Sequence, residues 1–130
     1  MIVGFTGTQD GMTRLQKAMF VGVLARLCPR EFHHGDCDGA DQEAHELVRE
    51  HAHNCLIVIH PSDNDSKRAF CHGDSMREPK PYLDRNRAIV FACDELVAAP
   101  KTRTEELRSG TWATVRAARR SGKPVHMVWP

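Results

Sequence analysis

The chain has 130 residues, of which 41% are hydrophobic and 27% charged, and its formal net charge is +1. These values are typical of a single compact globular domain, and a charge near zero gives no general attraction to nucleic acid or to anionic membranes. No apolar run approaches the ~20 residues of a membrane span. The five cysteines are scattered without a CxxC pair, which predicts free thiols in a reducing cytoplasm. The N-terminus has no basic region and is typical of a first strand, so we expect no signal peptide.

The first part of the chain predicts a strand followed by a helix. Residues 2–6 are short, apolar and partly β-branched, as in a buried strand. Thr13 and Gln16 have the spacing of a capping box, and Pro29 ends the helix that follows. We expect the core side of this helix to consist of apolar residues spaced by four: Leu15, Met19, Val23 and Leu27.

The next part predicts a second strand at 31–34, a second helix over 40–53 with Asp38 as its N-cap, and a third strand at 55–60. Residues 62–81 show no periodicity. A loop of this length in a compact domain is usually functional or mobile.

The last part predicts a helix over 82–93, a strand at 95–100 and a second polar loop at 101–108. Ser109 caps a final helix over 110–120, which Gly122 closes. A strand at 124–129 completes the chain.

Strands that alternate with helices predict a Rossmann-like three-layer α/β sandwich, formed by residues 1–130 as one domain. We expect a five-stranded parallel sheet in the order 3-2-1-4-5, with helices on both faces. Such sheets bind ligands at the carboxyl ends of their strands, near the point where the strand order reverses.

Three turns that contain glycine fall at this edge: Gly7-Thr8, Gly35 to Asp41, and Ser109-Gly110-Thr111. Glycine permits sharp turns and close approach, and the free N–H groups at the start of a helix bind anions. A capped junction between strand and helix would explain one such turn. Three at the same edge favour a ligand that carries phosphate.

The turns resemble those of the SLOG superfamily of Rossmann-like nucleotide-ligand-binding proteins. This superfamily includes the LOG phosphoribohydrolases, often labelled lysine decarboxylases, and the DNA-processing protein of natural transformation. Residues 34–41 resemble its H-G-x-x-x-G-A-D turn, residues 84–87 its R-N segment, and residues 108–112 with 122–125 its G-x-G-T and G-K-P-V ending. The resemblance implies a nucleotide-derived small-molecule ligand and a homo-oligomer.

From the turns and the resemblance together, we expect Arg85 to supply the counter-charge to phosphate, and the hydroxyl groups of Ser109 and Thr111 to add donors. Trp112 either stacks on a base or packs against the last strand. The full set of expected ligand-binding residues is Gly7, Thr8, Gly35, Asp36, Gly39, Ala40, Asp41, Arg85, Asn86, Ser109, Gly110, Thr111 and Trp112.

The sequence departs from the LOG pattern at the catalytic position. Thr114 stands where the phosphoribohydrolases have their catalytic glutamate. Glu105 and Glu106, in the preceding loop, are the candidate replacements, with Asp36 as a third. Asp36 also replaces a glycine of the family turn, and we expect it to accept a hydrogen bond from a ribose hydroxyl or a backbone N–H.

The sequence leaves three functions open. It also leaves open whether the protein is an enzyme. The first is binding, as in sensing, carrying or sequestering a nucleotide-derived molecule. The second is an N-glycosidase or phosphoribohydrolase that acts on a nucleoside monophosphate or an NAD-derived nucleotide. The third is single-stranded nucleic acid binding, which the low charge and the scarcity of aromatic residues do not favour. No metal site or cofactor is expected, because the residues around His33 and Cys37 lack ligand spacing.

Overall fold

The computed structural model describes all 130 residues and contains one parallel sheet of six strands. The strand order is β4-β3-β2-β1-β5-β6. The predicted Rossmann-like class and the order of the five predicted strands are confirmed, but the sheet has six strands, not five. The strands are β1 (Ile2–Gly7), β2 (Glu31–His34), β3 (Leu56–Ile59), β4 (Ser75–Met76), β5 (Glu95–Ala99) and β6 (Val125–Met127).

The additional strand β4 lies in the segment 62–81, which the sequence predicts as a loop. Its two residues pair with the end of β3. The carboxylate of Asp74 holds this edge, since it accepts the N–H of Ile57 at 2.8 Å and pairs with Arg49 at 2.9 Å. A strand of two exposed residues has no hydrophobic alternation, so no pattern in the sequence indicates it.

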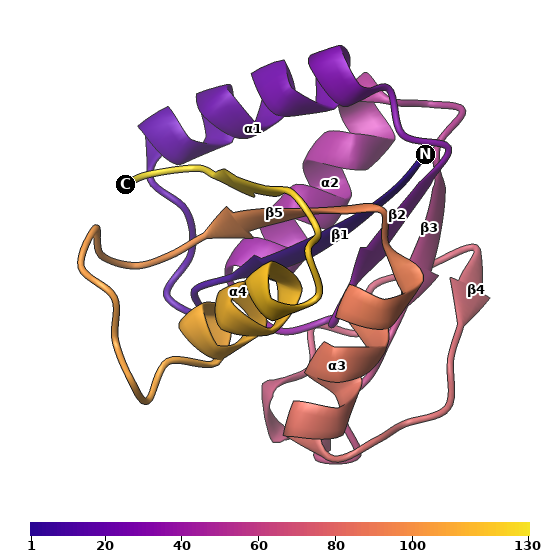
Figure 1. The fold of residues 1–130 in the computed structure, drawn as a ribbon. Helices are drawn as coiled ribbons and strands as arrows, with labels where there is room; N and C mark the ends of the chain where they lie inside the picture. The colour runs from indigo at the N-terminus through magenta and orange to yellow at the C-terminus, as the bar shows by residue number, and fades with distance from the viewer.

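Two helices cover each face of the sheet (Figure 1). Helices α1 (Arg14–Leu27) and α2 (Ala40–His51) pack on one face, where the rings of Phe5, Phe20 and Phe32 meet with centroids 5.4 to 5.8 Å apart. Helices α3 (Tyr82–Ala92) and α4 (Gly110–Arg120) cover the other face, over Leu96 and Ala98. None of these helices has the length and apolar character needed to cross a bilayer.

Helix α1 turns a different face to the core from the one expected. Leu15 is 56% exposed and Met19 36% exposed, so their assignment to the core is wrong, whereas Val23 and Leu27 do pack against it. The fully buried positions include Gln16, whose amide donates to the carbonyl groups of Pro100 at 2.8 Å and Val128 at 2.9 Å. A polar residue with both donors satisfied can face the core, and the pattern of apolar residues alone does not reveal this.

The N-cap of α2 also differs from the prediction. The cap residue is Gly39, with φ of 87° and no side-chain cap, and the Asp38 prediction is wrong. The backbone N–H of Asp38 donates to the carbonyl of Lys67 instead. Gly39 is required by its positive φ and by the carbonyl group of Gln9, which occupies the space that a Cβ would need. The predicted capping box at the start of α1 and the Ser109 cap of α4 are confirmed.

Candidate functional site

The ends of β1 and β5 and the start of α4 enclose a hollow of about 420 Å³, which we name the α4 compartment. It lies between β1 and β5, where the strand order reverses and open parallel sheets bind ligands. Five of the expected site residues line it: Gly7, Thr8, Ser109, Gly110 and Thr111.

The start of α4 leaves hydrogen-bond donors free in this compartment. The hydroxyl of Ser109 accepts the N–H of Trp112, whereas the N–H groups of Gly110 and Thr111 bond to no group of the chain. These two donors stand at the positive end of the helix dipole, so they can bind an anion.

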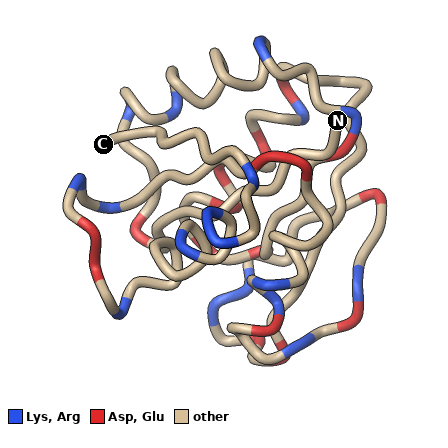
Figure 2. The backbone as a smooth tube through the Cα atoms, viewed as in Figure 1, with Lys and Arg blue, Asp and Glu red and all other residues tan.

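Charged residues of both signs complete the α4 compartment, as Figure 2 shows for the loop that leads into α4. Lys101 pairs with Asp10 at 2.9 Å, and Glu106 accepts a hydrogen bond from the hydroxyl of Thr102. Arg108 has no ion-pair partner. One basic side chain is therefore available to a ligand without breaking an existing ion pair.

A second hollow of about 340 Å³, which we name the loop compartment, lies between the turn after β2 and the residues 62–68. Gly35 and Cys37 contribute from the turn, and Ser62, Asp63, Asn64, Ser66, Lys67 and Arg68 from the loop. Burial raises the pKa of Cys37 to about 11, so its thiol stays protonated at neutral pH and is a poor nucleophile.

Two residues, Gln9 and Tyr82, line both compartments. One face of the Tyr82 ring is covered by the guanidinium of Arg85, whose Cζ lies 4.8 Å from the ring centroid. The Tyr82 hydroxyl reaches the start of α4, where a Cβ on Gly110 would overlap it. Tyr82 is 40% exposed, so part of this ring faces solvent at the junction of the two compartments.

Arg85 lies below the compartments and supports the turn after β2. Its Nη1 donates to the carbonyl groups of Gly35 at 2.5 Å and His60 at 3.1 Å, and its Nε to the Asn86 side chain at 2.9 Å. A side chain at position 35 would collide with this guanidinium, which explains the glycine there. Arg85 is 2% exposed. Arg85 lines neither compartment, so its expected role as the counter-charge to phosphate stays a prediction.

The structure places Asp41 and Asn86 beside Arg85, around a small interior hollow of about 10 Å³. The Asp41 carboxylate accepts the N–H of Cys37 at 3.1 Å, and burial raises the pKa of Asp41 to about 6. The Nδ2 of Asn86 is buried and makes no hydrogen bond. This donor therefore borders the interior hollow without a partner.

Asp36 does not reach either compartment. Its side chain is fully buried, and its Oδ2 accepts from Nε and Nη2 of Arg68, both at 2.9 Å. Its Oδ1 accepts the N–H of Cys71 at 2.9 Å, which fulfils the expectation of a backbone donor. Its φ of 58° lies in the region that favours glycine, the residue of the family turn. Asp36 thus joins the segment 62–81 to the turn after β2. Both of its buried carboxylate oxygens accept hydrogen bonds from this segment, so neither is available to a substrate.

Three other expected residues serve the packing of the fold. The N–H of Ala40 donates to the carbonyl of Thr8, and Gly39 abuts Gln9, so neither opens onto a compartment. Trp112 is 3% exposed and packs against Trp129, with ring centroids 6.0 Å apart. Of the two alternatives for Trp112, the structure shows packing.

The candidate catalytic carboxylates differ in whether they line a compartment. Glu105 pairs with Arg116 at 2.8 Å and lines neither compartment, whereas Glu106 lines the α4 compartment. The hydroxyl of Thr114 donates to the carbonyl of Gly110 inside the helix. Glu106 is the one candidate of the three in position to reach a bound ligand.

His34, His45 and Cys71 have atoms within 4.8 Å of one another, although no metal site is expected from the sequence. Nδ1 of His34 accepts the N–H of Asp36, so its Nε2 carries the proton and donates to Nδ1 of His45 at 3.0 Å. Burial and Asp36 raise the pKa of the Cys71 thiol to about 12. His34 therefore has no lone pair free for a metal, and hydrogen bonding accounts for the two rings.

Sequence reasoning missed Gln9, Lys67, Tyr82, Lys101 and Arg108 as lining residues. Gln9, Tyr82 and Lys101 come within two residues of a strand end or at the first residue of a helix, so the edge rule could have included them. Lys67 carries no such signal. Its position depends on bonds between residues far apart in the chain.

A scan against protein-family models finds no match for this sequence, and a search of curated proteins finds no relative. Solved structures, in contrast, are similar in fold. The molybdenum cofactor binding protein from the phototrophic bacterium Rippkaea orientalis is 17% identical with a TM-score of 0.73, over 99% of this chain and 76% of that one.

Two further structures are similar over most of this chain. The structural-genomics target TM1055 is 16% identical with a TM-score of 0.65, over 95% of this chain and 71% of its own. DNA processing protein A from Streptococcus pneumoniae is 17% identical with a TM-score of 0.69, over 96% of this chain and 49% of its own. At 16–17% identity these likenesses show a shared fold, the Rossmann-like α/β sandwich of this chain.

Proposed function

We propose that the protein binds a phosphate-bearing, nucleotide-derived small molecule in the α4 compartment. The observation that carries this proposal is the pair of free N–H groups at Gly110 and Thr111, at the sheet edge where the strand order reverses. The hydroxyl groups of Ser109 and Thr111 and the unpaired Arg108 lie around them. Donors of these types at a helix N-terminus suit a phosphate group.

The similar structures support a small-molecule ligand without identifying it. One of them is described as a molybdenum cofactor binding protein. DNA processing protein A has the same fold, but a shared fold does not transfer its function to this chain. Self-association, which the family resemblance implies, stays a prediction, to be tested by light scattering at tens of micromolar protein.

The test is calorimetric titration with nucleoside monophosphates, ADP-ribose and NAD⁺. A Gly110→Val variant should lose binding at least tenfold, because the added side chain displaces Tyr82 and covers the free N–H groups. Gly22→Val is the matched control, since a Cβ at Gly22 in α1 meets nothing within 4 Å. If the Gly110→Val protein keeps its circular dichroism spectrum and the parent's affinity for every nucleotide, the site lies elsewhere.

Hydrolysis is the second candidate, because Glu106 faces the α4 compartment. A positioned carboxylate contributes about 10²–10⁴-fold to such a reaction. Chromatography of the same mixtures distinguishes the two functions. Intact ligand recovered after heat release supports binding alone. Free base that accumulates with the parent and with Glu105→Gln, but not with Glu106→Gln, would make the protein a glycosidase.

A further inference from the structure

We propose that the ligand spans both compartments and is a dinucleotide, with one nucleotide unit in each. This inference rests on the proposed function and deepens it by naming the size and class of the ligand. It follows from the volumes, the charges and the junction of the two compartments.

The two compartments have similar sizes. At about 420 and 340 Å³, each lies within the range of roughly 300–1,000 Å³ that is typical of small-molecule sites. They meet at Gln9 and Tyr82, and the small hollow over Asn86 is lined by these same two residues. A mononucleotide in the α4 compartment would leave the loop compartment empty.

Each compartment offers one basic side chain without an acidic partner. In the α4 compartment this is Arg108, since Lys101 is paired with Asp10. In the loop compartment it is Lys67, whose Nζ donates only to the neutral amide of Gln9 at 3.1 Å, whereas Arg68 is paired with Asp36. Two separate free cations match a ligand with phosphates at two positions.

Tyr82 supplies an aromatic surface at the junction. One face of its ring packs on Arg85, which is itself fixed by four hydrogen bonds, so little side-chain freedom is lost when a base stacks on the other face. Base stacking on an aromatic side chain is sequence-tolerant and contributes about 10- to 100-fold to affinity.

The wall of the loop compartment is held in position by contacts within the chain and needs no ligand to form. The buried pair of Asp36 and Arg68 joins it to the turn after β2, and backbone bonds join Asp38 to Lys67 and Ala69 to Asp36. Its exposed polar side chains include Asp63, a carboxylate able to accept from ribose hydroxyl groups. The loop compartment therefore has the donors and acceptors of a second nucleotide site.

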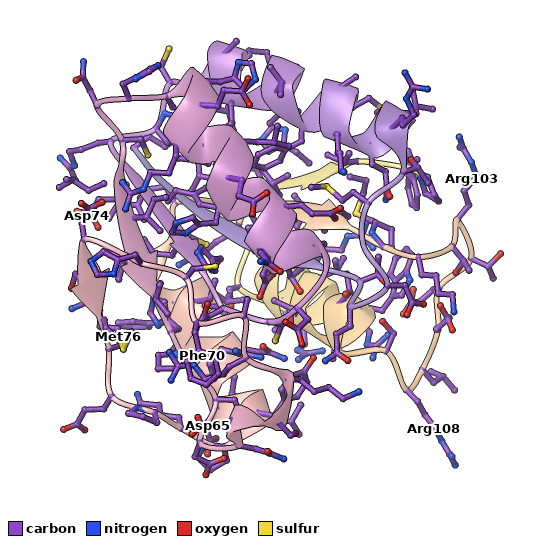
Figure 3. The ribbon with its side chains drawn as sticks, turned by 180° about the vertical axis from the view of Figure 1, so that it is seen from behind. Asp65, Phe70, Asp74, Met76, Arg103 and Arg108 are labelled. Carbon is purple, nitrogen blue, oxygen red and sulfur yellow. The ribbon has the colours of Figure 1, made fainter.

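The experiment compares AMP with the linear diadenylate pApA and with NAD⁺ by calorimetry. At least one dinucleotide should bind the parent ten times more tightly than AMP. Lys67→Ala should weaken that dinucleotide about tenfold and leave AMP within twofold. Arg108→Ala should weaken both. Lys80→Ala and Arg103→Ala are matched controls, because neither side chain lines a compartment; Arg103 and Arg108 lie on the same loop (Figure 3).

The outcomes separate this inference from the proposed function. If AMP binds as tightly as both dinucleotides, or if Lys67→Ala weakens AMP and dinucleotide equally, the two-compartment ligand is wrong and mononucleotide binding stands. If the folded parent binds no nucleotide at all, the proposed function fails and the inference fails with it.

Discussion

Asp36 and Arg68 form the strongest side-chain link between the turn after β2 and the segment 62–81. The carboxylate is fully buried and the Arg68 side chain is 13% exposed, so removing the cation leaves a buried charge without its partner. We expect Arg68→Ala to lower the free energy of unfolding by about 2–4 kcal/mol. Urea unfolding measures this loss.

The control for this prediction is Arg103→Ala, an exposed arginine with no ion-pair partner, which should change the stability by less than about 0.5 kcal/mol. Equal stability of the Arg68→Ala protein and its parent would show that water solvates Asp36 once the pair is broken. It would also mean that the wall of the loop compartment is not held by this pair.

At the residue scale, the sequence could predict positions whose role is local. Ser109 and Thr13 cap helices through bonds within three residues, and both were predicted correctly. The roles of Asp36 and Trp112 could not be predicted from the local sequence. Their surroundings, Arg68 and Trp129, lie 32 and 17 residues further along the chain and are brought close only by the fold.

At the scale of elements, α1 is joined to the end of the sheet through the Gln16 amide. A Gln16→Met substitution keeps the volume but leaves the carbonyl groups of Pro100 and Val128 without this donor in a buried position. Each unpaired buried group costs about 1–3 kcal/mol, so we expect thermal and urea unfolding to show a loss of about 2–4 kcal/mol.

Leu15→Met is the matched control on the same helix, because Leu15 is 56% exposed and contributes little to the core. If Gln16→Met proved as stable as Leu15→Met, apolar packing would compensate for all three lost bonds, the third being the one that the Gln16 side chain accepts from the N–H of Thr13. The docking of α1 would then depend on its apolar residues Phe20, Val23, Leu24 and Leu27.

The elements themselves were largely predictable because most of them leave a periodic signal. Residues 55–60 are almost continuously apolar, as a strand covered on both faces must be. Helix α1 has apolar residues on more than one side, so its buried face depends on which side can satisfy Gln16. Strand β4 depends on Asp74 and on pairing with β3, and neither appears as a local pattern.

For the molecule as a whole, one part of the candidate site could be predicted from the sequence and another part could not. Because every strand is parallel, the topology alone brings Gly7, Thr8 and Gly110 to one edge. The loop compartment needs the pairing of residues 62–68 with the turn after β2, a contact between distant segments that one sequence does not reveal. The α4 compartment was therefore predictable, and the loop compartment was not.

Four buried histidines make the stability of the whole molecule sensitive to acid. They form two hydrogen-bonded pairs, His33 with His60 and His34 with His45. Burial lowers the pKa of all four, and that of His60 to about 3. The unfolded chain therefore binds protons below about pH 6.5 that the folded chain does not bind, and stability falls as the pH falls through this value.

Asp41 opposes this effect in part. Burial raises the pKa of Asp41 to about 6, so the folded state takes up a proton there that the unfolded state takes up only near pH 4. Four buried histidines with lowered pKa values stand against the single carboxyl of Asp41, so we expect a net loss of stability between pH 7.5 and pH 5. Urea unfolding at the two pH values measures it.

A His60→Gln variant should reduce this pH dependence, because it removes one group that the folded state holds neutral, while His53→Gln should leave it unchanged since His53 is exposed. The difference between the variants matters more than the absolute stability of either, because His60→Gln also alters the bond to His33. Parallel pH profiles for the two variants would show that protonation of His60 is not resisted by the fold, and the acid sensitivity would then have to come from His33, His34 and His45.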